Sequence, residues 1–169
     1  MTALLGVDLG VHKIAISVFA EGDSGLTLYE VLAHTSTGAT RADQLAEVAA
    51  VAHDTALFYD ADWCFIEEPI MGNNHKYSLQ LSATCGAVMA RLAGLRHQQS
   101  LAIEMASNKA WKKAIIGNGN SSKDVIRTWV HEHHPAYAAL CGVDQDQYDA
   151  VCIGLYGLDL VDRAAHLTL

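Results

Sequence analysis

The chain has 169 residues, which predicts one domain spanning 1–169, and 51% of them are hydrophobic, enough for a sizeable core. A net charge of −8 argues against a protein that coats nucleic acid non-specifically, although six of the eleven lysines and arginines lie within residues 96–127 and can bind phosphates locally. The first residues lack a basic signal-peptide segment and no apolar run reaches bilayer-spanning length, so we expect a cytoplasmic protein with no membrane partner.

The N-terminal part of the chain predicts three consecutive strands followed by a helix. Apolar residues fill 3–9 and recur through 13–20 and 26–33, a pattern typical of an antiparallel meander. Residues 41–58 have leucine, valine and alanine at helical spacing. The short apolar run 62–67 then predicts a buried strand, parallel to the first.

Strands and helices alternate over the rest of the chain. The longest predicted helix, 77–95, carries an apolar stripe (Leu81, Cys85, Val88, Leu92 and Leu95) beside a flank of small residues (Ala83, Gly86, Ala87, Ala90 and Ala93). A fifth strand is expected at 100–106, and three helices at 108–116, from a Ser121–Asp124 capping box to about 133, and at 145–162. This order predicts an α/β fold whose mixed five-stranded sheet has antiparallel strands first and parallel strands after, flanked by helices.

Acidic residues end two of the predicted strands and begin the last helix. Asp8 ends the first strand and Glu67 the fourth, so their carboxylates meet at one edge of the sheet if the strands are neighbours. Asp146 and Asp149, three residues apart, share one helix face, whereas Glu68 is expected to face solvent or DNA. Converging carboxylates repel unless they hold a cation such as Mg²⁺ or Mn²⁺. Two such ions about 4 Å apart stabilise the attacking and leaving oxygens of phosphodiester hydrolysis.

Four stretches, in this order, resemble the RuvC family of Holliday junction resolvases, within the RNase H-like superfamily. They are GVDLG (6–10), FIEEPIMGNN (65–74), KKAIIGNGNSSKDVI (112–126) and DQYDAVCIGL (146–155). The resemblance implies a metal-dependent, structure-selective endodeoxyribonuclease with two Mg²⁺ or Mn²⁺ ions per site. It also implies a homodimer that nicks two strands of a four-way junction. Helix 77–95 is the candidate interface because of its apolar stripe and its flank of small residues.

The same resemblance assigns roles to individual residues. It places Asp8, Glu67, Asp146 and Asp149 at the four catalytic, metal-binding positions. It places Lys112 and Lys123 at positions that contact DNA. We expect the DNA-binding surface to include four further residues, which lie within the second and third stretches or just before the third: Lys109, Lys113, Asn118 and Asn73.

Departures from the family pattern leave the substrate open. Leu9 stands where the family usually has proline, and Pro69-Ile70 replaces an aromatic residue that often wedges at the junction centre. Phage-encoded relatives diverge in this way and can cut other branched DNA. Two alternatives remain. An RNase H-type nuclease acting on RNA–DNA hybrids or structured RNA would use the same four acids. A non-catalytic protein that binds branched DNA would use the basic residues alone. GVDLG also resembles a phosphate loop of sugar kinases, but those proteins need a much longer chain.

Overall fold

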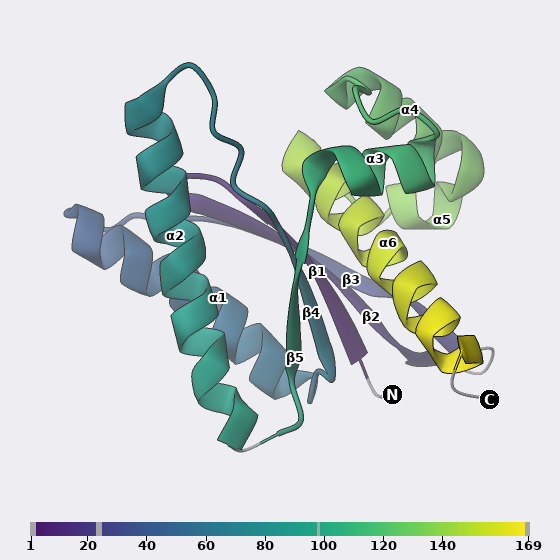
Figure 1. Ribbon diagram of the computed structural model, residues 1–169, viewed down its shortest axis with the longest axis horizontal. Helices are drawn as coiled ribbons and strands as arrows, with labels where there is room; N and C mark the ends of the chain where they lie inside the picture. The colour runs from purple at the N-terminus through teal and green to yellow at the C-terminus, as the bar shows by residue number, and fades with distance from the viewer. Residues whose placement is uncertain (1–2, 23–24, 98, 168–169) are drawn as a thin grey trace.

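The computed structural model describes residues 3–22, 25–97 and 99–167 and is built on one mixed sheet (Figure 1). Its five strands lie in the order β3-β2-β1-β4-β5, with β1–β2 and β2–β3 antiparallel and β1–β4 and β4–β5 parallel. This confirms the expected mixed sheet. The strand bounds are β1 Ala3–Leu9, β2 Lys13–Gly22, β3 Gly25–Thr35, β4 Trp63–Glu67 and β5 Ala102–Ala106.

Helices cover both faces of the sheet. In Figure 1, α1 and α2 lie on one face, and α6 lies on the other together with α3, α4 and α5. The bounds are α1 Arg41–Phe58, α2 His75–Ala93 followed by the 3₁₀ turn η1 Gly94–His97, α3 Asn108–Ile116, α4 Lys123–His133, α5 Pro135–Ala138 and α6 Gln145–Leu167. None of the helices in the described part of the chain is long and apolar enough to cross a membrane.

The helices differ in several details from the sequence prediction. The helix predicted at 77–95 is α2, which ends at Ala93 and is followed by the 3₁₀ turn, and α6 continues past the predicted 162 to Leu167. The N-cap of α4 is Ser122, whose side chain accepts a hydrogen bond from the Val125 amide. Ser121, the expected capping residue, instead donates a hydrogen bond from its hydroxyl to the Asn118 carbonyl. The short helix α5 was not predicted. It has a proline at its first position, which suits a helix start, but four residues are too few to show a helical hydrophobic period.

Side chains of β1 and β4 alternate between two hydrophobic cores, one on each face of the sheet. Leu5 and Val7 belong to the core under α1 and α2, whereas Leu4 belongs to the core under α6. In β4, Ile66 faces the first core and Phe65 the second. Successive strand residues point to opposite faces, so Asp8, the next-to-last residue of β1, and Glu67, the last residue of β4, both emerge on the α6 face.

Glycine allows α6 to approach the sheet closely. A Cβ on Gly6 would lie 2.3 Å from the Gly154 nitrogen and 2.5 Å from the Ala150 carbonyl oxygen, so no other residue fits there without displacing α6. The Ser17 hydroxyl donates to the same Ala150 carbonyl at 2.7 Å. This contact holds the second turn of α6 against the middle of β1, where Ser17 pairs with Gly6.

The apolar stripe of α2 belongs to the core and is not available as an interface. Cys85, Val88, Leu92 and Leu95 are all buried under the sheet. The flank of small residues lies differently, because Gly86 and Ala90 are exposed. The small flank is therefore open to a partner, whereas the buried residues of the stripe are not.

Candidate active site

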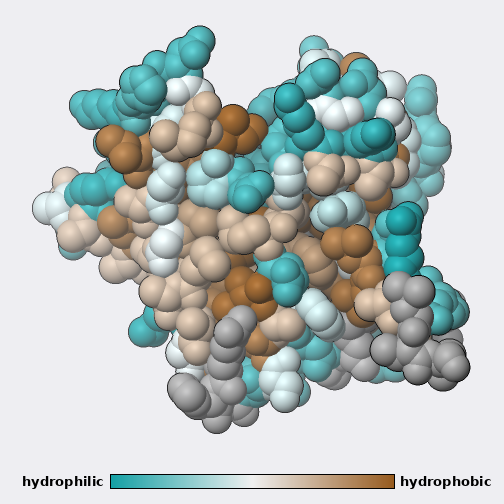
Figure 2. All heavy atoms as spheres, viewed as in Figure 1, coloured by the Kyte–Doolittle hydropathy of each residue, from teal (hydrophilic) through white to brown (hydrophobic). Residues whose placement is uncertain are grey.

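A polar hollow opens at the C-terminal ends of β1 and β4. It is lined by the segment after β4 and by residues of α2, α3, α4 and α6. In Figure 2 hydrophilic residues gather on both sides of it, over the N-terminal end of α2 and over α3 and α4. Its lining includes all four predicted acids and three lysines: Asp8, Glu67, Asp146, Asp149, Lys13, Lys112 and Lys123.

Three of the acids form a tight cluster. Asp8, Asp146 and Asp149 each offer a carboxylate oxygen, and these atoms lie within 4.8 Å of one another. Each of the three residues is at most 7% exposed. The parallel register pairs Val7 with Ile66, which makes Asp8 and Glu67 the next residues on neighbouring strands. Strand alternation and the three-residue spacing on α6 therefore produce the convergence that the sequence predicted.

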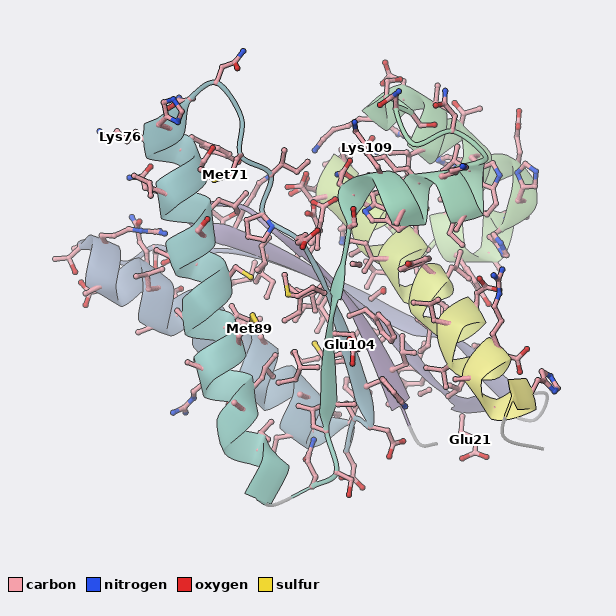
Figure 3. All side chains as sticks on the ribbon, viewed as in Figure 1. Glu21, Met71, Lys76, Met89, Glu104 and Lys109 are labelled. Carbon is pink, nitrogen blue, oxygen red and sulfur yellow. The ribbon has the colours of Figure 1, made fainter. Side chains whose placement is uncertain are left out.

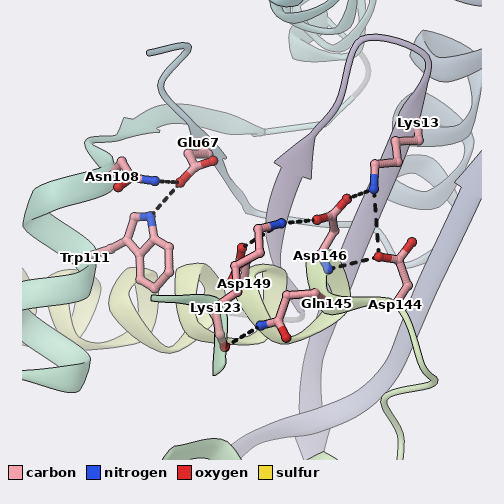
Figure 4. Close-up of polar contacts among 9 residues, drawn as sticks. All are labelled: Lys13, Glu67, Asn108, Trp111, Lys123, Asp144, Gln145, Asp146 and Asp149. Carbon is pink, nitrogen blue, oxygen red and sulfur yellow. Dashed lines mark hydrogen bonds and ion pairs between the residues drawn. The ribbon is translucent and has the colours of Figure 1, made fainter. Parts of the chain in front are cut away.

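Glu67 lies beside this cluster and is held from its other side. Besides burial, its charge is among the causes that raise the pKa of Asp8, so the two carboxyl groups lie close enough to repel each other. Its Oε1 accepts from the Asn108 amide and, at 3.0 Å, from the Trp111 indole nitrogen (Figure 4). Both donors belong to α3, so the helix that follows β5 fixes the carboxylate that ends β4. Glu68 is exposed, as expected, although it also lines the hollow.

Burial and mutual repulsion separate the acids by their pKa values. Burial, reinforced by the charges of Glu67, Asp149 and Asp146, raises the pKa of Asp8 well above its ordinary value. Burial also raises the pKa of Asp149 to about 6, against the opposing charge of Lys123. Burial acts on Asp146 too, but hydrogen bonds from Lys123 and Lys13 outweigh it and lower the pKa of Asp146.

Two lysines from different elements neutralise Asp146. The Lys123 Nζ donates to Asp146 Oδ1 at 2.6 Å and lies 3.8 Å from Asp149 Oδ2. The Lys13 Nζ, from the start of β2, contacts the other oxygen, Oδ2 (Figure 4). Asp8 has no such cation partner among the ion pairs of the described residues, so the negative charge of the cluster is only partly balanced.

The donor set fits a divalent cation. Asp149 Oδ1 is buried and, among the described residues, has no hydrogen-bond partner. A buried carboxylate oxygen without a partner is costly, and a cation held between Asp149, Asp8 and Asp146 would satisfy it. Oxygen-only ligands favour Mg²⁺ or Mn²⁺ over softer metals.

Comparison with known proteins decides the family. The family profile described as "Crossover junction endodeoxyribonuclease RuvC" matches residues 4–153. The chain belongs to the RuvC family. The resemblance indicated by the four sequence motifs is thereby confirmed. The crossover junction endodeoxyribonuclease RuvC of Salinibacter ruber is 28% identical over 164 residues, which cover 86% of this chain and 87% of that relative.

Solved structures share the fold. Thermus thermophilus RuvC superposes with a TM-score of 0.69 at 17% identity, covering 91% of this chain and 92% of that one. T. thermophilus RuvC in complex with a Holliday junction substrate gives a TM-score of 0.71 at 16% identity, with 92% of both chains covered. The yeast mitochondrial resolvase Ydc2 gives 0.59 at 12% identity, covering 90% of this chain and 77% of Ydc2. The fold is thus the RNase H-like fold of these proteins.

The residues expected to bind DNA in this RuvC-family chain fall into two groups. Lys112 and Lys123 line the hollow, and Lys109 lines an adjoining hollow together with Gly119, Asn120 and Ser121. The other three, Lys113, Asn118 and Asn73, are exposed but line neither hollow. Asn118 orders the turn between α3 and α4, because its Oδ1 accepts from the Asn120 amide at 3.0 Å. Figure 3 places Lys109 at the start of α3 and Met71 in the segment before α2.

Three residues of the site were missed by sequence reasoning. Asn108 and Trp111 hold Glu67, and the only available signal was their position on a short helix directly after a strand. Trp111 is fully buried, so its indole has no face free for stacking on bases. Lys13 follows Asp8 across a short turn, but nothing in its spacing indicated that it would reach Asp146.

Proposed function

We propose that this chain is a metal-dependent, structure-selective endodeoxyribonuclease that resolves four-way DNA junctions, acting as one nuclease domain in the cytoplasm. The observation that carries the proposal is the convergence of Asp8, Asp146 and Asp149 beside Glu67, in a chain of the RuvC family. The solved complex of T. thermophilus RuvC with a Holliday junction substrate, in a protein of the same fold, supports the same class of substrate here.

The four acids would hold two divalent ions, Mg²⁺ or Mn²⁺. Bound ions stabilise the charge that develops on the attacking and leaving oxygens of the phosphodiester. The chain's own contribution is positional, because Asn108 and Trp111 orient the carboxylate of Glu67. Lys112 and Lys123, on the wall formed by α3 and α4, would bind backbone phosphates of the DNA as it enters the hollow.

We also propose that the protein works as a homodimer. Two symmetric cuts across a junction need two active sites related by a twofold axis, and a C₂ dimer supplies them. The small flank of α2 suits such an interface because a Cβ added at Gly86 would meet no atom within 4 Å. Beside it, alanines of α1 and α2, including Ala49 and Ala90, line an open groove. Small residues of this kind let a second helix approach closely.

The test is a cleavage panel with a matched pair of variants. Four-way junction, three-way junction, flap, duplex and RNA–DNA hybrid are compared with Mg²⁺ and with Mn²⁺. Glu67→Gln should abolish cleavage because a metal-binding carboxylate is lost. It should leave junction binding in EDTA largely intact, because the lysines of α3 and α4 remain. Glu68→Gln, the same change at the adjacent exposed residue, should be mild. Faster cleavage of the hybrid than of any branched DNA would replace the proposal with the RNase H-type alternative.

A further inference from the structure

Lys13 enters the hollow from the side opposite the other lysines. It begins β2, whereas Lys112 and Lys123 belong to α3 and α4. Its Nζ contacts Asp146 Oδ2 and lies 3.8 Å from Asp144 Oδ1. In Figure 4 Lys13 lies on one side of the acid cluster and Glu67 on the other. The Lys13 side chain is 37% exposed, so its ammonium group remains accessible from the hollow.

Gly10 allows the Lys13 side chain to take this path. A Cβ on Gly10 would lie 2.5 Å from Lys13 Cγ and 3.2 Å from Lys13 Cε. The aliphatic stem of the lysine therefore lies directly over the glycine backbone. The Gly10 amide also donates to the Lys13 carbonyl at 2.9 Å, which closes the turn between β1 and β2. Any side chain at position 10 would push the lysine stem away from the acids.

The turn that carries Lys13 is fixed from outside. Arg41 of α1 donates to the Val11 carbonyl, and the Thr84 hydroxyl of α2 donates to the same carbonyl at 2.9 Å. Arg41 also donates to Thr84 Oγ1 at 2.7 Å. The lysine therefore projects from a rigid turn, which is what a residue that must meet a ligand at a defined point requires.

We propose that Lys13 contacts a phosphate of the bound nucleic acid in the active site, from the β2 side, while Lys112 and Lys123 bind the backbone from the α3–α4 side. The inference rests on the proposed function, since it requires nucleic acid to enter the hollow. Asp146 already has Lys123 on its Oδ1, so Lys13 is the second cation on one carboxylate. A backbone phosphate entering between the two walls would give its ammonium group an anionic partner of its own.

The competing role for Lys13 is purely structural, as a counter-ion for Asp146. The Asp146→Asn background separates the two roles, because it removes the negative charge of Asp146 and leaves Lys13 with only the more distant Asp144 carboxylate, at 3.8 Å. Junction binding is measured in EDTA by fluorescence anisotropy over a series of salt concentrations. Asp146→Ala is the second background if the first variant melts too low. Arg163→Ala is the matched control, since it removes one positive charge at the far end of α6.

We expect Lys13→Ala in the Asp146→Asn background to weaken junction binding by about threefold to tenfold and to flatten the salt dependence by about one unit of slope. Arg163→Ala should change neither to a comparable degree. Gly10→Ala should reproduce most of the loss in the same background. It should add little once Lys13 is already alanine, because both changes remove one contact.

Unchanged affinity and slope on adding Lys13→Ala would overturn the inference and leave Lys13 as a counter-ion. The same substrates distinguish this from failure of the proposed function. If Lys13→Ala weakens binding to duplex or hybrid and the protein does not prefer junctions, the phosphate contact of Lys13 is supported. The proposal that the protein resolves junctions is then contradicted. Absence of binding to any nucleic acid would overturn both proposals.

Discussion

Replacing Asp149 by asparagine should stabilise the metal-free protein. The carboxylate is buried, and its Oδ1 has no hydrogen-bond partner among the described residues. Burial raises the pKa of Asp149 from 3.8 to about 6, although Lys123 opposes the rise. The ionised form is therefore the unfavourable one in the folded protein at neutral pH. Asparagine has nearly the same shape and no charge to bury.

The size of the effect follows from proton linkage. A pKa of about 6 in the folded protein against 3.8 corresponds to about 3 kcal/mol of lost stability once Asp149 is ionised. The carboxamide needs hydrogen-bond partners of its own, so we expect a net gain of roughly 1–3 kcal/mol, or about 2–10 °C in melting temperature for a chain of this length.

The pH dependence gives the prediction its sign. The folded state binds the Asp149 proton more tightly than the unfolded chain does, because folding raises this pKa. The contribution of Asp149 to stability is thus most favourable below about pH 4 and falls as the pH rises to about 6, above which its loss is complete. The gain from Asp149→Asn should therefore be full above pH 6 and vanish near pH 4.

The assay is thermal and urea unfolding in EDTA at pH 7.5 and pH 4.5, followed by addition of Mg²⁺. Asp146→Asn is the matched control: lysine contacts lower the pKa of Asp146, so its amide variant should not be stabilised. Mg²⁺ should raise the melting temperature of the unmodified protein more than that of either variant, through linkage to a site that each change impairs. The reasoning is refuted if Asp149→Asn is no more stable than the unmodified protein at pH 7.5, or if its gain is the same at both pH values.

Three further predictions concern DNA binding, assembly and packing. Lys112→Ala should weaken binding to every branched substrate and reduce the salt slope by about one, and an unchanged slope in anisotropy titrations would remove its phosphate contact. Ala90→Glu should sediment as a folded monomer that makes single nicks in junctions. The control variant Ala136→Glu, on α5, should sediment and cleave like the unmodified protein. Sedimentation of the unmodified protein as a monomer at micromolar concentration would contradict the dimer proposal. Gly6→Ala should lower the free energy of unfolding by roughly 3 kcal/mol in urea titrations, because its Cβ meets the α6 backbone at 2.3 Å. Gly86→Ala adds a Cβ that meets no atom of its own chain within 4 Å, so in the monomeric Ala90→Glu background it should stabilise the chain by about 0.5–1 kcal/mol. Equal effects of the two glycine changes in that background would contradict the packing of α6.

Local periodicity in the sequence predicted most of the elements of the fold and the position of the acids of the site. The helices α1 and α3 have the bounds that their spacing predicted, and alternation along β1 and β4 put Asp8 and Glu67 on one face. Asp146 and Asp149 share a face of α6 because of their spacing alone. These features depend on the geometry of single elements, which a sequence pattern reports directly.

Contacts between distant segments were decided only by the tertiary structure. The close approach of α6 depends on Gly6 and Gly154 meeting across the chain, and neither glycine indicates its partner. Lys13 reaches Asp146 because its stem lies over Gly10. The hydrogen bond from Trp111 of α3 to Glu67 depends on where that helix lies after β5. A periodic pattern identifies the buried face of an element but not which element covers it, so the acids could be predicted from the sequence and the groups that orient and neutralise them could not.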